Sequence, residues 1–148
     1  MNELAFVTQF IIDEFKLNIL VNTITFEKSS DIDLNKENIY PLVNIDIIES
    51  TYGDQVLTFN YIITILQQRD TEPKLTDNKI FGSNLIDNLN ECNSIAVKFL
   101  TSVRNTNDTN IDFIEISVIE MIKYEYGNLL DGVKFTLTAE YPNLTPCN

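Results

Sequence analysis

Two adjacent segments that alternate between apolar and polar residues constrain the fold of this chain more than any other feature. They lie within residues 39–67 and are separated by the sequence Ser-Thr-Tyr-Gly-Asp at residues 50–54. In the second segment the apolar residues Leu57, Phe59, Tyr61, Ile63 and Ile65 occupy every other position. A period of two is typical of a strand with one buried face, and Gly and Asp are favoured in turns. The pattern predicts an antiparallel hairpin.

The predicted hairpin is unusually long. Its first arm places Val43, Ile45 and Ile47 on one face, with Asn44 and Asp46 on the other. Its second arm reaches about 13 residues, or roughly 44 Å, whereas most strands contain about 3–10 residues. We therefore expect the hairpin to protrude from its own sheet and to offer its edges to another molecule.

The remaining pattern predicts two helices and three further strands. Residues 3–18, and a segment from Thr76 or Asp77 to about Arg104, show the apolar spacing of amphipathic helices. Their apolar stripes are Leu4, Val7, Ile11 and Phe15 in the first helix, and Leu85, Leu89, Cys92, Ala96, Phe99 and Val103 in the second. Strands are predicted within residues 19–28, 111–126 and 133–141, with a bend near Ile119. This order predicts a single α+β domain over residues 1–148, an antiparallel sheet with a long hairpin flanked by two helices, and an irregular C-terminal tail at 142–148.

Composition limits the environment of the chain. Its 148 residues include 10 Lys and Arg against 22 Asp and Glu, a net charge of −12. No apolar segment approaches the length of a membrane span, and the N-terminus lacks the basic region and cleavage site of a signal peptide. We expect a soluble protein made in the cytoplasm. The charge has two interpretations, solubility alone or a surface that faces nucleic acid without binding it.

Residues typical of catalysis are scarce. The chain has no histidine, which is the commonest general base, and no nucleotide-binding or nucleophile motif. Carboxylate pairs such as Glu115 with Glu120, or Asp131 with Glu140, are expected on solvated strand faces. We therefore predict that the protein is not an enzyme and holds no cofactor.

A metal site and a disulfide are not expected either. Residues 31–35 have the Asp-x-Asp-x-Asn spacing of a calcium loop, but Lys36 replaces the required Gly and Leu42 the required Glu. Cys92 lies on an apolar helix face, where a free cysteine behaves as a small hydrophobic residue.

Three pieces of the sequence resemble a known protein group. They are Asn38-Ile-Tyr-Pro-Leu-Val43 at the start of the hairpin, the amphipathic helix that follows the hairpin, and the ending Glu140-Tyr-Pro-Asn-Leu-Thr-Pro-Cys147. Together they resemble the small neck proteins of tailed bacteriophages, the head–tail connector and tail-terminator group. The resemblance is greatest to versions in phages of Bacteroidetes, including crAss-like phages.

The resemblance implies a structural virion protein with a tail-terminator-like fold. It implies a homo-oligomeric ring of six or twelve copies in the neck, joining the portal to the tail, with genomic DNA passing through the lumen without specific binding. An irregular acidic loop at 29–38 and the hairpin tip are then the candidate interface or lumen segments. Their residues are Asp31, Asp33, Glu37, Tyr52, Gly53 and Asp54.

Two other classes of protein stay open. The first is an acidic, non-enzymatic adaptor or DNA-mimic protein that acts as a monomer or dimer. The second is an accessory subunit of an enzyme. The mass of the protein in solution distinguishes a ring from the first alternative.

Overall fold

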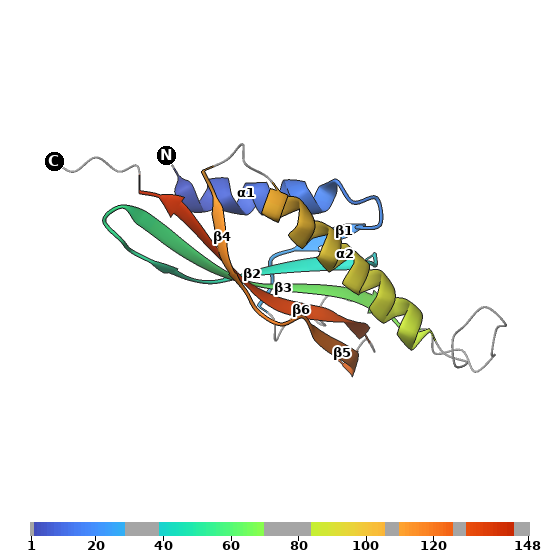
Figure 1. Ribbon diagram of the computed structural model, residues 1–148. Helices are drawn as coiled ribbons and strands as arrows, with labels where there is room; N and C mark the ends of the chain where they lie inside the picture. The colour runs from blue at the N-terminus through green and yellow to red at the C-terminus, as the bar shows by residue number, and fades with distance from the viewer. Residues whose placement is uncertain (1, 29–38, 70–83, 106–109, 126–129, 144–148) are drawn as a thin grey trace.

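The fold is a single sheet with two helices packed on one of its faces (Figure 1). The computed structural model describes residues 2–28, 39–69, 84–105, 110–125 and 130–143. In chain order the elements are α1 (Glu3–Lys16), β1 (Thr23–Thr25), β2 (Leu42–Thr51), β3 (Val56–Gln68), α2 (Leu85–Asn105), β4 (Asp112–Ile116), β5 (Glu120–Glu125) and β6 (Leu130–Pro142). The predicted α+β class is confirmed.

The sheet has the strand order β1-β2-β3-β6-β4, and β5 pairs with β6 beside β4. The β2–β3 pair is the predicted antiparallel hairpin. β1 differs from the expectation of an antiparallel sheet, because it pairs with β2 in parallel from Thr23↔Leu42 to Thr25↔Asn44. The segment that connects Thr25 to Leu42 is long enough for the crossover that parallel neighbours require.

The second arm of the hairpin is paired along its whole length. Every residue of β3, from Val56 to Gln68, pairs with a residue of β6. β6 contains 13 residues and is longer than the predicted 133–141 strand, so it accompanies β3 to the hairpin tip. The second arm therefore offers no free edge of its own, because β6 occupies its outer side. Its length is used inside the sheet.

The helix α1 forms as its sequence predicts. The side chain of Asn2 accepts a hydrogen bond from the Ala5 backbone N–H at 3.2 Å, which caps the first turn. Val7, Ile11 and Phe15 are buried against the sheet. The hydroxyls of Thr8 and Tyr61 lie 3.1 Å apart and tie the helix to β3.

The buried stripe of α2 is rotated from the prediction. Cys92, Ala96, Phe99 and Val103 are buried as expected, but Asn88 and Ile95 are buried with them. Leu85 and Leu89 lie at the border of the core and are only partly covered. α2 begins at Leu85, and its predicted start at Thr76 or Asp77 lies outside the described residues. The buried side of α2 is the side that faces the apolar residues of β3 and β6, and the apolar spacing of the helix alone does not specify it.

The core lies mainly between the helices and the sheet. Alternate residues of β3 and β6 supply its floor, and the rings of Phe15 and Phe99 stack at 4.1 Å between the two helices. A smaller apolar cluster of Leu42, Leu66, Ile122 and Leu130 lies at one end of the opposite face. Within the described residues, this end of the sheet therefore has buried apolar side chains on both faces.

Asn44 lies on the predicted polar face of β2, but this position is not exposed. Its side chain is fully buried. Its Oδ1 accepts hydrogen bonds from Thr25 Oγ1 at 2.7 Å and the Glu27 N–H at 2.9 Å. Its Nδ2 donates to the Glu27 carbonyl at 2.9 Å. β1 and the residues after it cover this position and satisfy the amide, so burial carries no unpaired polar group.

Gly132 marks a close approach between β6 and β3. A Cβ built at this residue would lie 1.9 Å from the carbonyl oxygen of Ile65. Gly132→Ala therefore requires the backbones of two central strands to separate, and we expect it to lower the free energy of unfolding by about 1–3 kcal/mol. Urea unfolding followed by circular dichroism measures this change. Thr136→Ala in the same strand is the control, with an expected loss below about 1 kcal/mol. Equal losses in the two variants would contradict the close approach.

Candidate interface on the open face of the sheet

A row of polar side chains crosses four strands on the face of the sheet opposite the helices. Glu49 in β2 pairs with Asn60 in β3, Asn60 with Thr138 in β6, and Thr138 with Glu115 in β4. Their neighbours Tyr61 and Leu137 point into the core beneath the helices. Because successive side chains alternate between faces, the row lies on the other face. Both described helices leave this face open (Figure 1).

Two β-bulges bracket the row. The register of β2 against β3 shifts between Ile47 and Glu49, and the register of β4 against β6 shifts between Phe113 and Glu115. The extra residues are Ile48 and Ile114, whose side chains are 47% and 52% exposed. Bulges re-aim side chains locally. Here each bulge places an exposed isoleucine next to a glutamate, one at each side of the row.

These residues line a hollow of about 430 Å³. We call it the open-face groove and define it by six lining residues, Ile48, Glu49, Asn60, Ile114, Glu115 and Thr138. Lys134, which also lies on this face, forms an ion pair with Glu120 at 3.6 Å outside the groove. None of the residues that line the groove is a Lys or Arg.

Hydrogen bonds within the groove run in one direction. Thr138 Oγ1 donates to Asn60 Oδ1 at 2.8 Å, and Asn60 Nδ2 donates to Glu49 Oε1 at 2.7 Å. The donors of Thr138 and Asn60 are therefore directed along the row toward Glu49. The exposed carboxylates of Glu49 and Glu115 are hydrogen-bond acceptors. The groove is therefore suited to a ligand that brings hydrogen-bond donors and positive charge.

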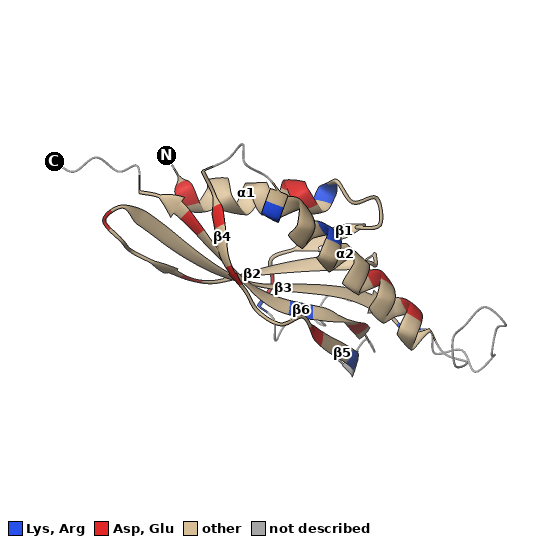
Figure 2. Cartoon of the chain, in the orientation of Figure 1, with Lys and Arg blue, Asp and Glu red and all other residues tan. Residues whose placement is uncertain are grey.

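Charge is segregated along α2. Asp87 and Glu91 lie in its N-terminal half and Lys98 and Arg104 in its C-terminal half, as Figure 2 shows. Residues 92–105 contain no Asp or Glu. The C-terminal half of α2 thus carries cations and no carboxylate of its own, while Glu14 of α1 accepts a hydrogen bond from Ser102 beside it.

The hairpin tip holds three of the predicted site residues. Tyr52 is 76% exposed, and its hydroxyl donates to Asp54 Oδ1 at 3.3 Å. Asn143 braces the tip from β6, because its Nδ2 donates to the Gly53 carbonyl at 3.1 Å and its N–H donates to the Gln55 carbonyl at 2.9 Å. The structure brings Tyr52, Gly53 and Asp54 together on a supported turn.

The other predicted site residues, Asp31, Asp33 and Glu37, lie outside the described residues, as does the calcium-like segment 31–36. Within the described ranges, no three His, Cys, Asp or Glu side chains group closely enough to hold a metal ion. No helix in the described part of the chain is long and apolar enough to cross a membrane.

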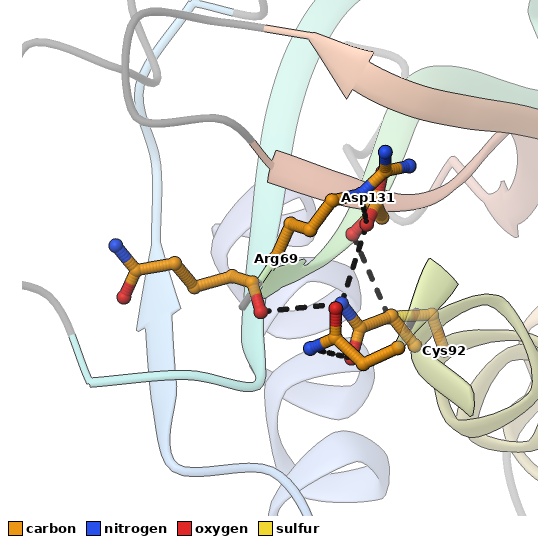
Figure 3. Close-up of polar contacts among 6 residues, drawn as sticks. Arg69, Cys92 and Asp131 are labelled. Carbon is orange, nitrogen blue, oxygen red and sulfur yellow. Dashed lines mark hydrogen bonds and ion pairs between the residues drawn. The ribbon is translucent and has the colours of Figure 1, made fainter. Parts of the chain in front are cut away.

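A buried ion pair joins Arg69, the residue after β3, to Asp131 in β6, and Asn88 of α2 reaches the same carboxylate (Figure 3). The carboxylate of Asp131 in β6 is fully buried and accepts two hydrogen bonds from Arg69, at 2.7 and 2.8 Å. Asn88 Nδ2 lies 3.3 Å from the same carboxylate and 3.1 Å from the Gln68 carbonyl. The sequence places Asp131 on a solvated surface with Glu140, and this prediction is wrong, because α2 and Arg69 cover its side chain.

The thiol of Cys92 lies beside this ion pair, with Sγ 4.0 Å from the Asp131 carbonyl oxygen. Burial, followed by the charges of Glu91 and Asp131, raises the pKa of Cys92 to about 12. A thiol with this pKa is protonated at neutral pH, and the thiolate is the nucleophilic form. Burial likewise raises the pKa of Tyr61, while its hydrogen bond with Thr8 lowers it to a smaller extent. These buried groups join elements together and are poorly suited to reaction.

Comparison with known proteins gives no family for the chain. No protein-family model matches it, and no curated protein matches its sequence. The function of the chain is therefore inferred from its own residues and from its resemblance to phage neck proteins.

Sequence reasoning missed the open-face groove. It identified Glu115 only as a solvated carboxylate and did not single out Glu49. A signal exists in hindsight, because Ile47-Ile48-Glu49 and Phe113-Ile114-Glu115 both interrupt the alternation of their strands. Which strands then stand side by side, and so whether the two glutamates share one surface, depends on the sheet order.

Proposed function

We propose that the chain is a structural subunit of the head–tail connector or tail-terminator type, assembled into a ring in the neck of a tailed bacteriophage. In this role it joins head to tail, lets genomic DNA pass through its lumen, and has no catalytic activity. The protein is made in the host cytoplasm and is incorporated into the virion, next to portal, neck and tail proteins.

The observation that supports this proposal most is the unequal cover of the two sheet faces. The helices pack on one face, while the other face carries the open-face groove with its exposed Ile48 and Ile114. Exposed apolar side chains rimmed by polar groups are typical of protein interfaces. A rigid sheet that is covered on one face and hollowed on the other is suited to a subunit that binds neighbours.

The hairpin tip is the proposed lumen or neighbour contact. Asp54 is exposed there, and Asn143 holds the turn in place. Lysine or arginine in a DNA channel would neutralise phosphates and hold the genome in a salt-dependent way. An acidic hairpin tip is suited to line a channel through which DNA passes without binding. We propose that Asp31, Asp33 and Glu37 line the same channel.

The test is the mass of the purified protein in solution. We expect a species with six or twelve times the 17.0 kDa of one chain, measured by light scattering coupled to size exclusion, and rings with a central hole in electron micrographs. Duplex DNA at low salt should not shift in a gel when the ring is added.

The alternative, an acidic adaptor or DNA mimic, is favoured by the net charge of −12. It predicts a monomer or dimer that competes with duplex DNA for a basic DNA-binding protein. A monomer or dimer at all protein concentrations, also with neighbouring virion proteins present, would overturn the ring.

A further inference from the structure

We propose that the C-terminal half of α2 in one copy docks into the open-face groove of a second copy. This inference rests on the proposed ring and names the contact that builds it. The residues on the two sides differ in kind, since the groove presents carboxylates and α2 presents cations.

The donor surface is a hollow of about 320 Å³ beside α2. We call it the α2 patch and define it by Val97, Leu100, Thr101, Arg104 and Ile116, which line it. Val97, Thr101 and Arg104 recur at spacings of four and three residues and so share one side of the helix. Val97 and Ile116 are exposed, and Lys98 adds a second exposed cation at the border of the patch.

The two surfaces match in chemistry. The open-face groove presents Glu49 and Glu115 flanked by Ile48 and Ile114, and the α2 patch presents Arg104 flanked by Val97 and Ile116. An arginine guanidinium brings several donors to carboxylate acceptors, and Glu49 and Glu115 are both exposed. The α2 patch supplies a cation and no carboxylate, so it suits an acidic groove of a second copy of this chain.

The positions of the two surfaces determine the kind of assembly. The α2 patch lies on the helix side of the sheet and the open-face groove on the opposite side, so they belong to different surfaces of the same chain (Figure 1). A contact between two different patches is heterologous, and its repetition gives a ring when the rotation closes. Each copy then uses its groove for one neighbour and its α2 patch for the other.

Charge reversal tests the contact. The groove variant is Glu49→Lys with Glu115→Lys, and the patch variant is Lys98→Glu with Arg104→Glu. Each alone sets like charges against each other, so we expect the concentration for half-assembly to rise about tenfold or more. The variant with all four substitutions keeps the wild-type net charge and restores complementary charges in every contact, so its assembly should return toward wild type.

Mixing the two double variants gives the sharpest result. The lysine groove of the first variant accepts the glutamate-bearing helix of the second, and the two remaining surfaces are wild type. An equimolar mixture should therefore assemble with alternating copies, although each variant alone does not. A symmetric contact of groove with groove would instead leave the patch variant, whose groove is wild type, able to assemble on its own.

Two controls separate docking from folding and from net charge. Circular dichroism must show the same thermal unfolding for both variants as for the wild type. If the lysine variant is less stable, Glu49→Gln with Glu115→Gln replaces it, because glutamine removes the charge and keeps an acceptor for Asn60. Lys16→Glu with Lys123→Glu changes the net charge as much as the patch variant, at exposed positions outside both surfaces, and should assemble like the wild type.

The outcomes distinguish this inference from the proposed function. A wild-type protein that forms rings while folded groove and patch variants assemble equally well overturns the docking and leaves the ring intact. A wild-type protein that stays monomeric overturns both. Loss of assembly in each double variant with recovery in the mixture supports the docking of α2 into the groove.

Discussion

Replacing Ile95 by aspartate will abolish the cooperative unfolding transition of this protein. Ile95 is fully buried in α2, among the side chains that join the helices to the sheet. The substitution loses about 1.5–3 kcal/mol of apolar burial and adds the larger cost of an unpaired charge in the core. A domain of this size is typically stable by about 5–15 kcal/mol, so the sum removes most or all of its stability. Far-ultraviolet circular dichroism during a urea titration measures the result.

The matched control is Leu89→Asp in the same helix. Leu89 is only partly covered, so its carboxylate reaches solvent by a change of rotamer. We expect a folded protein that loses less than about 2 kcal/mol, which includes the lower helix propensity of aspartate. Equal damage from the two substitutions would show that α2 is oriented differently, with Leu89 in the core.

Replacing Arg69 by methionine will lower the free energy of unfolding by about 3–5 kcal/mol. The substitution keeps much of the length of the side chain but removes the guanidinium that holds Asp131 through two hydrogen bonds. The carboxylate of Asp131 has no exposed surface, so it loses this ion pair without gaining water in the folded state. Chemical unfolding at neutral pH measures the loss.

The second substitution in this experiment is Asp131→Asn. In the double variant the charge is absent, so we expect part of the loss to be recovered relative to Arg69→Met alone. Lys134→Met is the matched control, because it breaks an exposed ion pair. The side chain of Lys134 is 41% exposed and that of its partner Glu120 is 65% exposed. Exposed pairs contribute about 1 kcal/mol or less. A double variant as unstable as Arg69→Met would contradict a buried charge as the cause.

The sequence by itself determined the local elements and the faces of the long strands. Alternation from Leu57 to Ile65 and from Val133 to Tyr141 predicted strands whose apolar residues face the core, and the structure confirms both. The stripe of α1 was predicted for the same reason. Each of these features depends on neighbours within a few residues, because side-chain direction follows the helical or strand period.

The tertiary structure decided which polar residues are buried and which surfaces face out. Asn44 and Asp131 are polar residues in strands whose sequences alternate, and both are buried. β1 covers Asn44 and pairs with it, while Arg69 and α2 cover Asp131 and pair with it. The open-face groove likewise needs β2 and β4 on opposite sides of the β3–β6 pair. Residues 49 and 115 are far apart in the chain, and no local pattern encodes their placement in one row. Such contacts depend on strand order and register, which are set by the packing of the whole sheet against its helices.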